Sequence, residues 1–236
     1  MLLEMSNIHS YYDKSHILHG VNIAIDEGEI VCLLGRNGVG KSTTLKSIIG
    51  LITPKPGSIQ FRNKELVGLR PYQICRLGVG YVPEERRIFP TLTVRENLVM
   101  GIKPNQKNVT QGDWTIDKVY GFFSALKSRD KQKGGHLSGG EQQMLTIGRT
   151  LMGNPQVLLV DEPTEGLAPL IVDMVVEILQ GIHNVGIPIL LVEQAMDVAQ
   201  DLAGRVYVMS KGEIVFQGPI KELLENHEIR QKYLEV

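Results

Sequence analysis

The hydrophobic pattern changes period several times along this 236-residue chain, and each change predicts a switch between strand and helix. Residues 2–8 and 17–25 alternate apolar and polar positions, which predicts two half-buried strands joined by a polar turn at 11–15. Short continuous apolar runs, typical of strands buried on both faces of a parallel sheet, lie at 29–34, 156–160 and 187–192. Shorter strands are predicted at 59–61 and 80–83 and a hairpin at 206–217, and helices at 44–49, 71–77, 171–182, 195–204 and 219–235. Strands that alternate with helices predict an α/β fold with a mostly parallel sheet, preceded here by an antiparallel β region at the N-terminus.

The middle of the chain has a different pattern, with helical spacing and no strand. Thr93 to Glu96 forms a capping box that starts a helix, and apolar residues recur at helical spacing from 114 to 126. Residues 102–112 are polar and predict a surface loop. We therefore expect a single domain over residues 1–236, in which residues 1–90 and 154–236 form the core and about 91–153 form an inserted α-helical subdomain.

Composition narrows the function classes. The chain carries 25 Lys and Arg against 26 Asp and Glu, so no general basic field points to nucleic acid. Residues 127–135 are locally basic, but a solvated linker is the favoured interpretation of that stretch. Two cysteines, Cys32 and Cys75, cannot build a disulfide framework. With no leader pattern and no apolar run of the roughly 20 residues that span a bilayer, we expect a cytoplasmic protein whose membrane contact comes through a partner.

The clearest chemical signal is the stretch from Gly35 to Thr43, which fits the phosphate-loop pattern G-x-x-x-x-G-K-[S/T]. An apolar strand precedes it and a helix follows it, which is the context that the pattern requires. The predicted ATP-binding residues are Gly35, Arg36, Asn37, Gly38, Val39, Gly40, Lys41, Ser42 and Thr43. Backbone N–H groups at the helix N-terminus would surround the phosphates, Lys41 would reach the β- and γ-phosphates, and Ser42 would ligate Mg²⁺.

A second acidic element completes the expected phosphate site. Asp161 ends an apolar strand, where it would hold Mg²⁺ together with Ser42, and Glu162 beside it is placed to orient or deprotonate an attacking water. The alternative is that this acidic pair only caps a helix. Tyr12, in the first predicted turn, is the candidate to stack on the adenine base, although it could equally cover a hairpin edge.

The stretch from Leu137 to Gln143, Leu-Ser-Gly-Gly-Glu-Gln-Gln, is a further helix N-terminus with glycines and no lysine. It is also an ordinary capping box between Ser138 and Glu141. Since it has no nucleotide site of its own nearby in the sequence, we expect it to bind the γ-phosphate of a nucleotide on a second copy.

Taken together, Gly35–Thr43, Leu137–Gln143 and Val157–Glu162 resemble the ATP-binding cassette (ABC) ATPases of membrane transporters, over essentially the whole chain. Finer features resemble the LivF-type ATPases of branched-chain amino acid importers. These are Val82–Pro90, Leu137–Met144, Asp161–Ala168 and Leu191–Gln194.

The resemblance implies a P-loop NTPase (RecA-like) core and two ATP molecules held between two cassettes. The trans-acting residues would be Ser138, Gly139, Gly140 and Glu141. Tyr12 falls where the family stacks an aromatic ring on adenine. The implied partners are transmembrane permease subunits docked in a groove near Glu84, Arg86, Phe89 and Thr93, a sister or identical cassette and, indirectly, a solute-binding protein. The cassette would then lie on the inner face of the membrane.

Three positions depart from the general ABC pattern. Glu84 stands where the family usually has glutamine, Gln194 where it has the switch histidine, and Ala168 where it has an aspartate. We assign catalytic roles to Glu162, Gln194 and Glu84, with Glu84 also a candidate Mg²⁺ ligand. Gln194 can hydrogen-bond to a phosphate or water but carries no charge.

Other functions stay open at this level. An importer of urea, short amides or aromatic acids would have a similar ATPase. Two further alternatives differ more from an importer ATPase. One is a soluble cassette ATPase that acts on nucleic acid or ribosomes, and the other is a nucleotide sensor with little turnover.

Overall fold

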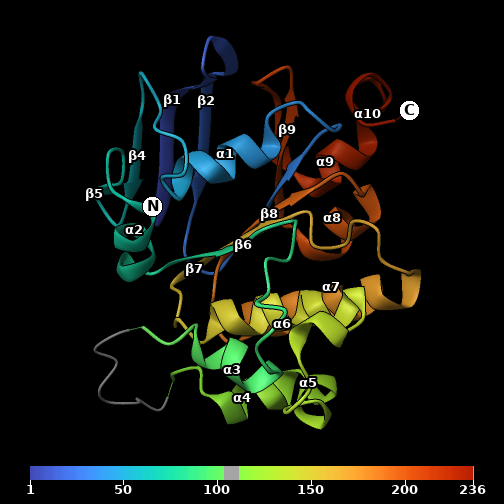
Figure 1. The fold of residues 1–236 in the computed structure, drawn as a ribbon. Coiled ribbons are helices and arrows are strands. Elements are labelled where there is room, and N and C mark those ends of the chain that lie inside the picture. Colours follow the sequence, from blue (N-terminus) through green and yellow to red (C-terminus); the bar gives the residue numbers. More distant parts are fainter. Residues whose placement is uncertain (104–111, 236) are drawn as a thin grey trace.

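The computed structural model describes residues 1–103 and 112–235, and a six-stranded sheet forms its centre (Figure 1). The strands are β3 (Ile30–Leu34), β6 (Val79–Val82), β7 (Val157–Asp161), β8 (Ile189–Glu193), β9 (Arg205–Ser210) and β10 (Glu213–Pro219), in the order β10-β9-β3-β8-β7-β6. All neighbours are parallel except β9 and β10, which are antiparallel. The carboxyl ends of β3, β7 and β8 therefore meet at one edge, where ligands bind in open α/β sheets.

A second, antiparallel sheet comes mainly from the N-terminal part of the chain. It contains β1 (Leu3–Tyr12), β2 (Ser15–Ile25), β4 (Ser58–Phe61) and β5 (Lys64–Glu65), in the order β2-β1-β4-β5. The predicted turn at 11–15 is shorter than expected, because Tyr12 already pairs with Ser15 and only two residues connect the strands. Asp13, at φ 51°, makes this tight connection.

Side-chain alternation along the central strands divides the interior into two cores. On β3, Ile30, Cys32 and Leu34 belong to one core, and Val31 and Leu33 belong to the other, because successive side chains on a strand point to opposite faces. The second core lies against the antiparallel sheet, α1 (Lys41–Ile48) and α2 (Pro71–Leu77). The first core is covered by the helices α7 (Pro169–Asn184), α8 (Met196–Leu202), α9 (Ile220–Glu225) and α10 (His227–Tyr233), together with the helices between β6 and β7.

Those intervening helices are α3 (Val94–Val99), α4 (Ile116–Phe122), α5 (Ser124–Ser128) and α6 (Gly139–Leu151), and they lie together beneath the central sheet in Figure 1. The helical spacing over 114–126 corresponds to two helices, because the chain breaks at Phe123 (φ −122°, ψ 70°) between α4 and α5. The break coincides with burial of the Phe123 ring, which is 1% exposed in the core. The loop predicted at 102–112 lies mostly outside the described residues.

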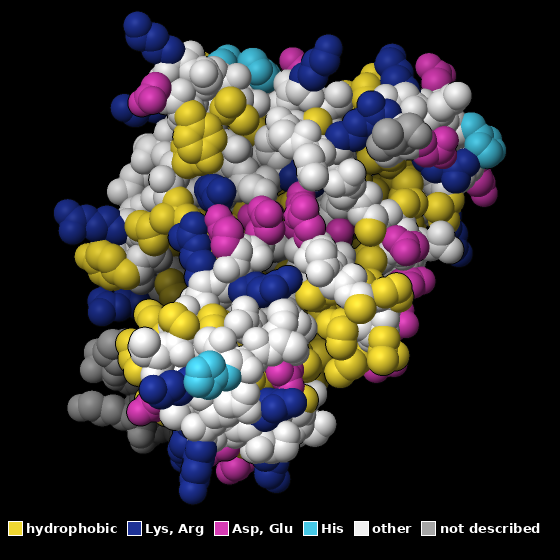
Figure 2. All heavy atoms as spheres, turned by 45° about the vertical axis from the view of Figure 1, so that its right-hand side comes forward, with side chains coloured by type: hydrophobic (Ala, Val, Ile, Leu, Met, Phe, Trp, Pro, Cys, Tyr) yellow, Lys and Arg dark blue, Asp and Glu magenta, His cyan; other side chains and the backbone are white. Residues whose placement is uncertain are grey.

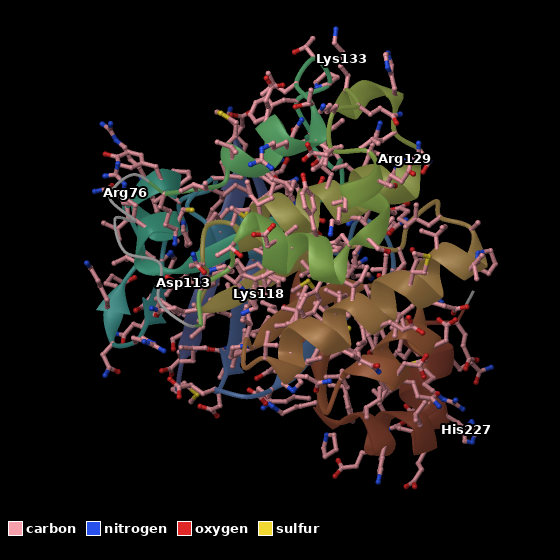
Figure 3. The ribbon with its side chains drawn as sticks, turned by 90° about the horizontal axis from the view of Figure 1, so that it is seen from below. Arg76, Asp113, Lys118, Arg129, Lys133 and His227 are labelled. Carbon is pink, nitrogen blue, oxygen red and sulfur yellow. The ribbon has the colours of Figure 1, made fainter. Side chains whose placement is uncertain are left out.

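The basic stretch 127–135 is also more ordered than a solvated linker. It contains the end of α5 and leads into a short 3₁₀ turn at Gly134–His136. Seen from below, Arg129 and Lys133 lie on the outer rim of the helical segment (Figure 3). Arg129 forms an ion pair with Glu141 in the first turn of α6, so this arginine supports a helix start.

Within residues 1–103 and 112–235, none of the helices has the combination of length and apolar character that crossing a membrane requires.

Candidate nucleotide-binding site

A cavity of about 230 Å³ lies over the N-terminus of α1. Its lining residues are Tyr12, Ile17, Gly38, Gly40, Lys41, Ser42, Thr43 and Glu162. Seven of these eight were predicted from the sequence, and Ile17 is the addition. The tyrosine side chain is 47% exposed at the cavity.

The loop takes its shape from glycines at positions that other residues rarely adopt. Gly38 and Gly40 have φ values of 79° and 116°. At Gly40 an added Cβ would also lie 2.8 Å from Leu18 Cδ2, so the close approach of the loop to β2 depends on the missing side chain. Gly40 is the N-cap of α1, and the first N–H groups of that helix are available to an anion.

Lys41 is almost fully buried, at 3% exposure, and its ammonium group has three acceptors. Nζ donates to the carbonyl oxygens of Gly35 (2.8 Å) and Arg36 (3.0 Å). It also lies 2.9 Å from Glu162 Oε1. Glu162, at 8% exposure and φ 42°, directly follows β7, so two residues separated by 121 positions form a buried ion pair at this edge of the sheet.

Asp161 is held on both carboxylate oxygens. Ser42 Oγ donates to Oδ1 at 3.0 Å, and the Tyr81 hydroxyl donates to Oδ2 at 3.0 Å. Burial raises the pKa of Asp161 above its usual range, and these two hydrogen bonds act in the opposite direction. A serine hydroxyl next to a carboxylate is the donor set that Mg²⁺ takes in phosphate-binding sites, so the residues fit that ion.

The remaining predicted loop residues do not line the cavity. Gly35 packs so closely on β9 that an added Cβ would lie 2.6 Å from the Met209 carbonyl oxygen. The carbonyl of Val39 accepts from the Gly212 N–H at 2.8 Å. Arg36 donates to the backbone carbonyl of Glu235, and Asn37 is exposed.

A second cavity, of about 460 Å³, shares Glu162 with the first and contains two of the three predicted catalytic residues, Glu162 and Gln194. It is lined by Glu162, Thr164, Glu165, Val172, Glu193, Gln194, Ala195, Asp197 and Val198. Gln194 is exposed in it. Acidic side chains also form a row across the middle of the face drawn in Figure 2.

Glu84, the other predicted catalytic residue, lies near these carboxylates and outside both cavities. It lies close to Glu165, which in turn lies close to Glu162. The pKa of Glu165 is raised to about 7. The largest cause is its closeness to Glu162, followed by partial burial and by the negative charges of Glu162 and Glu84. The described contacts place Glu84 beside Glu165, whereas Asp161 takes its hydrogen bonds from Ser42 and Tyr81.

The stretch around Ser138 forms the predicted capping box at the start of α6. Ser138 Oγ accepts from the Glu141 N–H at 3.3 Å, and Glu141 Oε2 accepts from the Ser138 N–H at 2.8 Å. Both glycines are in close contact with neighbouring side chains. A Cβ added at Gly139 would lie 2.7 Å from Arg86 Nη1, and one added at Gly140 would lie 2.6 Å from Ile171 Cγ2. None of the four predicted residues lines either cavity of the same chain.

A third cavity, a groove of about 450 Å³, lies between the core and the helical segment. Of the four residues predicted to border a docking groove, Phe89 lines it. Glu84, Arg86 and Thr93 are not among its lining residues: Arg86 lies against Gly139, and Thr93 caps α3. Among the described residues that line the groove, Arg87, Lys103 and Arg149 are cationic and none carries a carboxylate.

Several residues that the site uses were not predicted from the sequence. Tyr81 contacts Asp161, and Glu193 accepts a hydrogen bond from Thr164 Oγ1 at 2.7 Å. Glu193 also accepts from the backbone N–H groups of Gln194 (3.1 Å) and Ala195 (3.4 Å). One feature of the sequence could have indicated Glu193: it ends a continuously apolar strand. A glutamate in that position is expected to be buried and therefore to need hydrogen-bond partners.

The parallel sheet, the loop at the N-terminus of α1 and the Asp161–Glu162 pair at the end of β7 together define a P-loop nucleotide-binding ATPase. The profile of the ABC transporter family matches residues 18–165, and the chain belongs to that family. It is 44% identical over 233 residues to the high-affinity branched-chain amino acid transport ATP-binding protein BraG of Pseudomonas aeruginosa, with 99% of each chain covered. It is 34% identical to the probable branched-chain amino acid transport ATP-binding protein LivF of Archaeoglobus fulgidus, with 98% of this chain and 97% of the relative covered.

Solved structures give the same result for the fold. The ADP conformation of MJ1267, an ATP-binding cassette of an ABC transporter, superimposes with a TM-score of 0.82 at 27% identity, and the match covers 98% of this chain and 97% of that one. The predicted α/β P-loop fold and the resemblance to LivF-type ATPases are therefore confirmed.

Proposed function

We propose that this chain binds and hydrolyses ATP to energise an importer of branched-chain amino acids. The observation that carries the proposal is the cavity lined by the phosphate loop and Glu162, with Asp161 hydrogen-bonded to Ser42 of that lining, in a chain that matches BraG over 99% of its length. The solute itself is recognised elsewhere, in permease and solute-binding subunits, so its identity rests on the relatives.

In the nucleotide complex, Tyr12 would stack on the base and the N–H groups from Gly38 to Thr43 would hold the phosphates. Ser42 and Asp161 would hold Mg²⁺, which supplies positive charge against the phosphate oxygens. Glu84 stays a second candidate ligand.

Hydrolysis requires the Lys41–Glu162 pair to separate. Lys41 would turn from Glu162 to the β- and γ-phosphates, and the freed carboxylate would then orient a water for in-line attack on the γ-phosphorus and accept its proton. Gln194, in the cavity beside Glu162, would hydrogen-bond to this water or to the γ-phosphate.

The second half of each site would come from another cassette. Ser138 to Glu141 form the N-terminus of α6, where the N–H groups of Gly139 and Gly140 have no partner within the helix, and they lie outside the cavity of their own chain. Two cassettes arranged head to tail would place each such helix start on the other chain's γ-phosphate.

The groove beside Phe89 would receive a cytoplasmic helix of a permease subunit, which would keep the cassette on the inner face of the membrane. Its lining suits a helix that carries a carboxylate. Arg149 stacks its guanidinium over Phe89, 5.0 Å from the ring centre, and donates to the Arg87 carbonyl. Arg149 Nη1 has no hydrogen-bond partner within the part of the chain that the structure describes.

A pull-down of the tagged chain from detergent-solubilised membranes tests the assembly. Recovery of two permease subunits and a second cassette is the expected result. Recovery only from the soluble fraction, with nucleic acid or ribosomes bound, would overturn it. In vesicles of the recovered complex, ATP-driven uptake of labelled leucine should be competed by isoleucine and valine, and competition by urea, acetamide or benzoate instead would reassign the solute.

A further inference from the structure

Tyr81 lies between the groove and the phosphate site. Its side chain is half-buried on β6 and is part of the groove lining. Its hydroxyl donates to Asp161 Oδ2 at 3.0 Å. Its carbonyl oxygen accepts from Thr150 Oγ1 at 3.3 Å, on α6, the helix that begins at the Ser138 capping box.

The sheet register explains this position. Tyr81 pairs with Leu159 in the parallel β6–β7 ladder, so the two side chains share a face. Asp161 is two residues further along β7 and therefore lies on that same face. The tyrosine side chain is long enough to reach it, which a shorter residue at position 81 would not be.

The hydrogen bond from Tyr81 fixes one carboxylate oxygen of Asp161, and the other oxygen accepts from Ser42 Oγ. Within residues 1–103 and 112–235, the side chains that hydrogen-bond to Asp161 are Ser42, which lies in the nucleotide cavity, and Tyr81, which lies in the groove.

We propose that Tyr81 is a positioning residue that couples occupancy of the groove to the orientation of Asp161, and hence to metal-dependent nucleotide binding. A permease helix that enters the groove would displace the ring, and a displaced ring alters or breaks the bond to Asp161 Oδ2. This inference rests on the proposed metal role of Asp161 and on the proposed docking groove.

The first test uses the isolated full-length chain and needs no partner. The association constant for ADP is measured by calorimetry in EDTA and again in excess Mg²⁺. The constant in Mg²⁺ divided by the constant in EDTA gives the metal contribution to ADP binding. Tyr81→Phe, which removes only the hydroxyl, should lower this ratio about 10-fold, as is typical for groups that orient a metal ligand, and leave the EDTA value unchanged. Tyr72→Phe is the matched control, because Tyr72 lines the same groove and is exposed.

The second test occupies the groove chemically. Cys75 lines the groove and is exposed, whereas Cys32 is fully buried, and these are the two cysteines of the chain. Labelling Cys75 with pyrenyl maleimide should change the metal contribution to ADP binding in the wild type by about 5-fold or more. This value is at the lower end of the couplings measured between allosteric sites. The change should vanish in Tyr81→Phe and in Cys75→Ser treated with the same reagent.

The outcomes separate the inference from the proposed function. If Asp161→Asn lowers the ratio while Tyr81→Phe and the label have no effect, the Tyr81 coupling is wrong and the metal site stands. If neither the wild type nor Asp161→Asn shows a metal contribution, the metal role and the inference both fail. An equal effect of the label in the wild type and in Tyr81→Phe would place the coupling on another residue and overturn the role of Tyr81.

Discussion

Lys41 Nζ lies 2.9 Å from Glu162 Oε1, and both side chains are at least nine-tenths buried. The cation proposed to bind phosphate is thus neutralised by the carboxylate proposed to activate water. Neither group is free to act until a nucleotide separates them, which links substrate binding to release of the base.

Glu162→Gln should bind ATP but hydrolyse it at least about 100-fold more slowly, in the range lost when a general base is removed. The variant should accumulate as an ATP-bound dimer, observed by size-exclusion chromatography with light scattering. Glu177→Gln, an exposed position on α7, is the control. Turnover near the wild-type rate would remove Glu162 from the mechanism.

Lys41→Ala should weaken ATP binding by about 10- to 100-fold, because hydrogen bonds from a charged group to the phosphates are lost. It should also leave Glu162 buried without its counter-charge, at a cost of about 3–5 kcal/mol in the free energy of unfolding. Urea unfolding of the nucleotide-free chain measures this. Adding Glu162→Gln to Lys41→Ala should recover part of the loss, and no recovery would contradict the buried pair.

Ser138→Asp separates helix capping from phosphate binding. Aspartate is a good N-cap, so the stability of the chain should change little. Its charge would repel the γ-phosphate of the other cassette, so ATP-dependent dimerisation in the Glu162→Gln background should be lost while the isolated chain still binds ATP. Ser138→Asn, neutral and also a good cap, is the matched control. Dimerisation of Ser138→Asp as strong as that of Ser138→Asn would argue against a site shared between chains.

Glu193→Ala removes the acceptor of Thr164 and of two backbone N–H groups. We expect a loss of about 2–4 kcal/mol in the free energy of unfolding, from orphaned buried donors, and slower ATP turnover because the Gln194 segment loses its anchor. Thr164→Val, which removes one of these bonds, should have a smaller effect. Turnover per folded molecule that stays at the wild-type value would limit Glu193 to a structural role.

The same residue gives a pH dependence. Burial raises the pKa of Glu193 above its usual value of 4.5. At pH values between 4.5 and the raised pKa, the folded chain therefore binds more protons than the unfolded chain. Stability should therefore fall as the pH rises from 4.5 through the raised pKa. Chemical denaturation across this range should show a less negative slope in Glu193→Gln, and an identical slope would contradict the raised pKa.

The sequence was sufficient wherever the signal is local. The phosphate loop needs glycines at positive φ and a lysine at a helix start, and these requirements fall within nine consecutive residues. The apolar runs of β3, β7 and β8 are equally local, because strands buried on both faces leave a continuous hydrophobic signal. The capping boxes at Thr93 and Ser138 were readable for the same reason, since their partners are three residues apart.

The break at Phe123 and the contact of Arg86 with Gly139 could not be predicted from the sequence. Both depend on which other parts of the chain pack against these residues. The same holds for Tyr81, whose partner Asp161 is 80 residues away and becomes its neighbour only through the β6–β7 register. By itself, the sequence determined the α/β class, the nucleotide loop and the acidic pair, because each follows from residues close together in the chain. Only the tertiary structure decided which side chains meet at the sheet edge, since those contacts come from strand order and packing between distant segments.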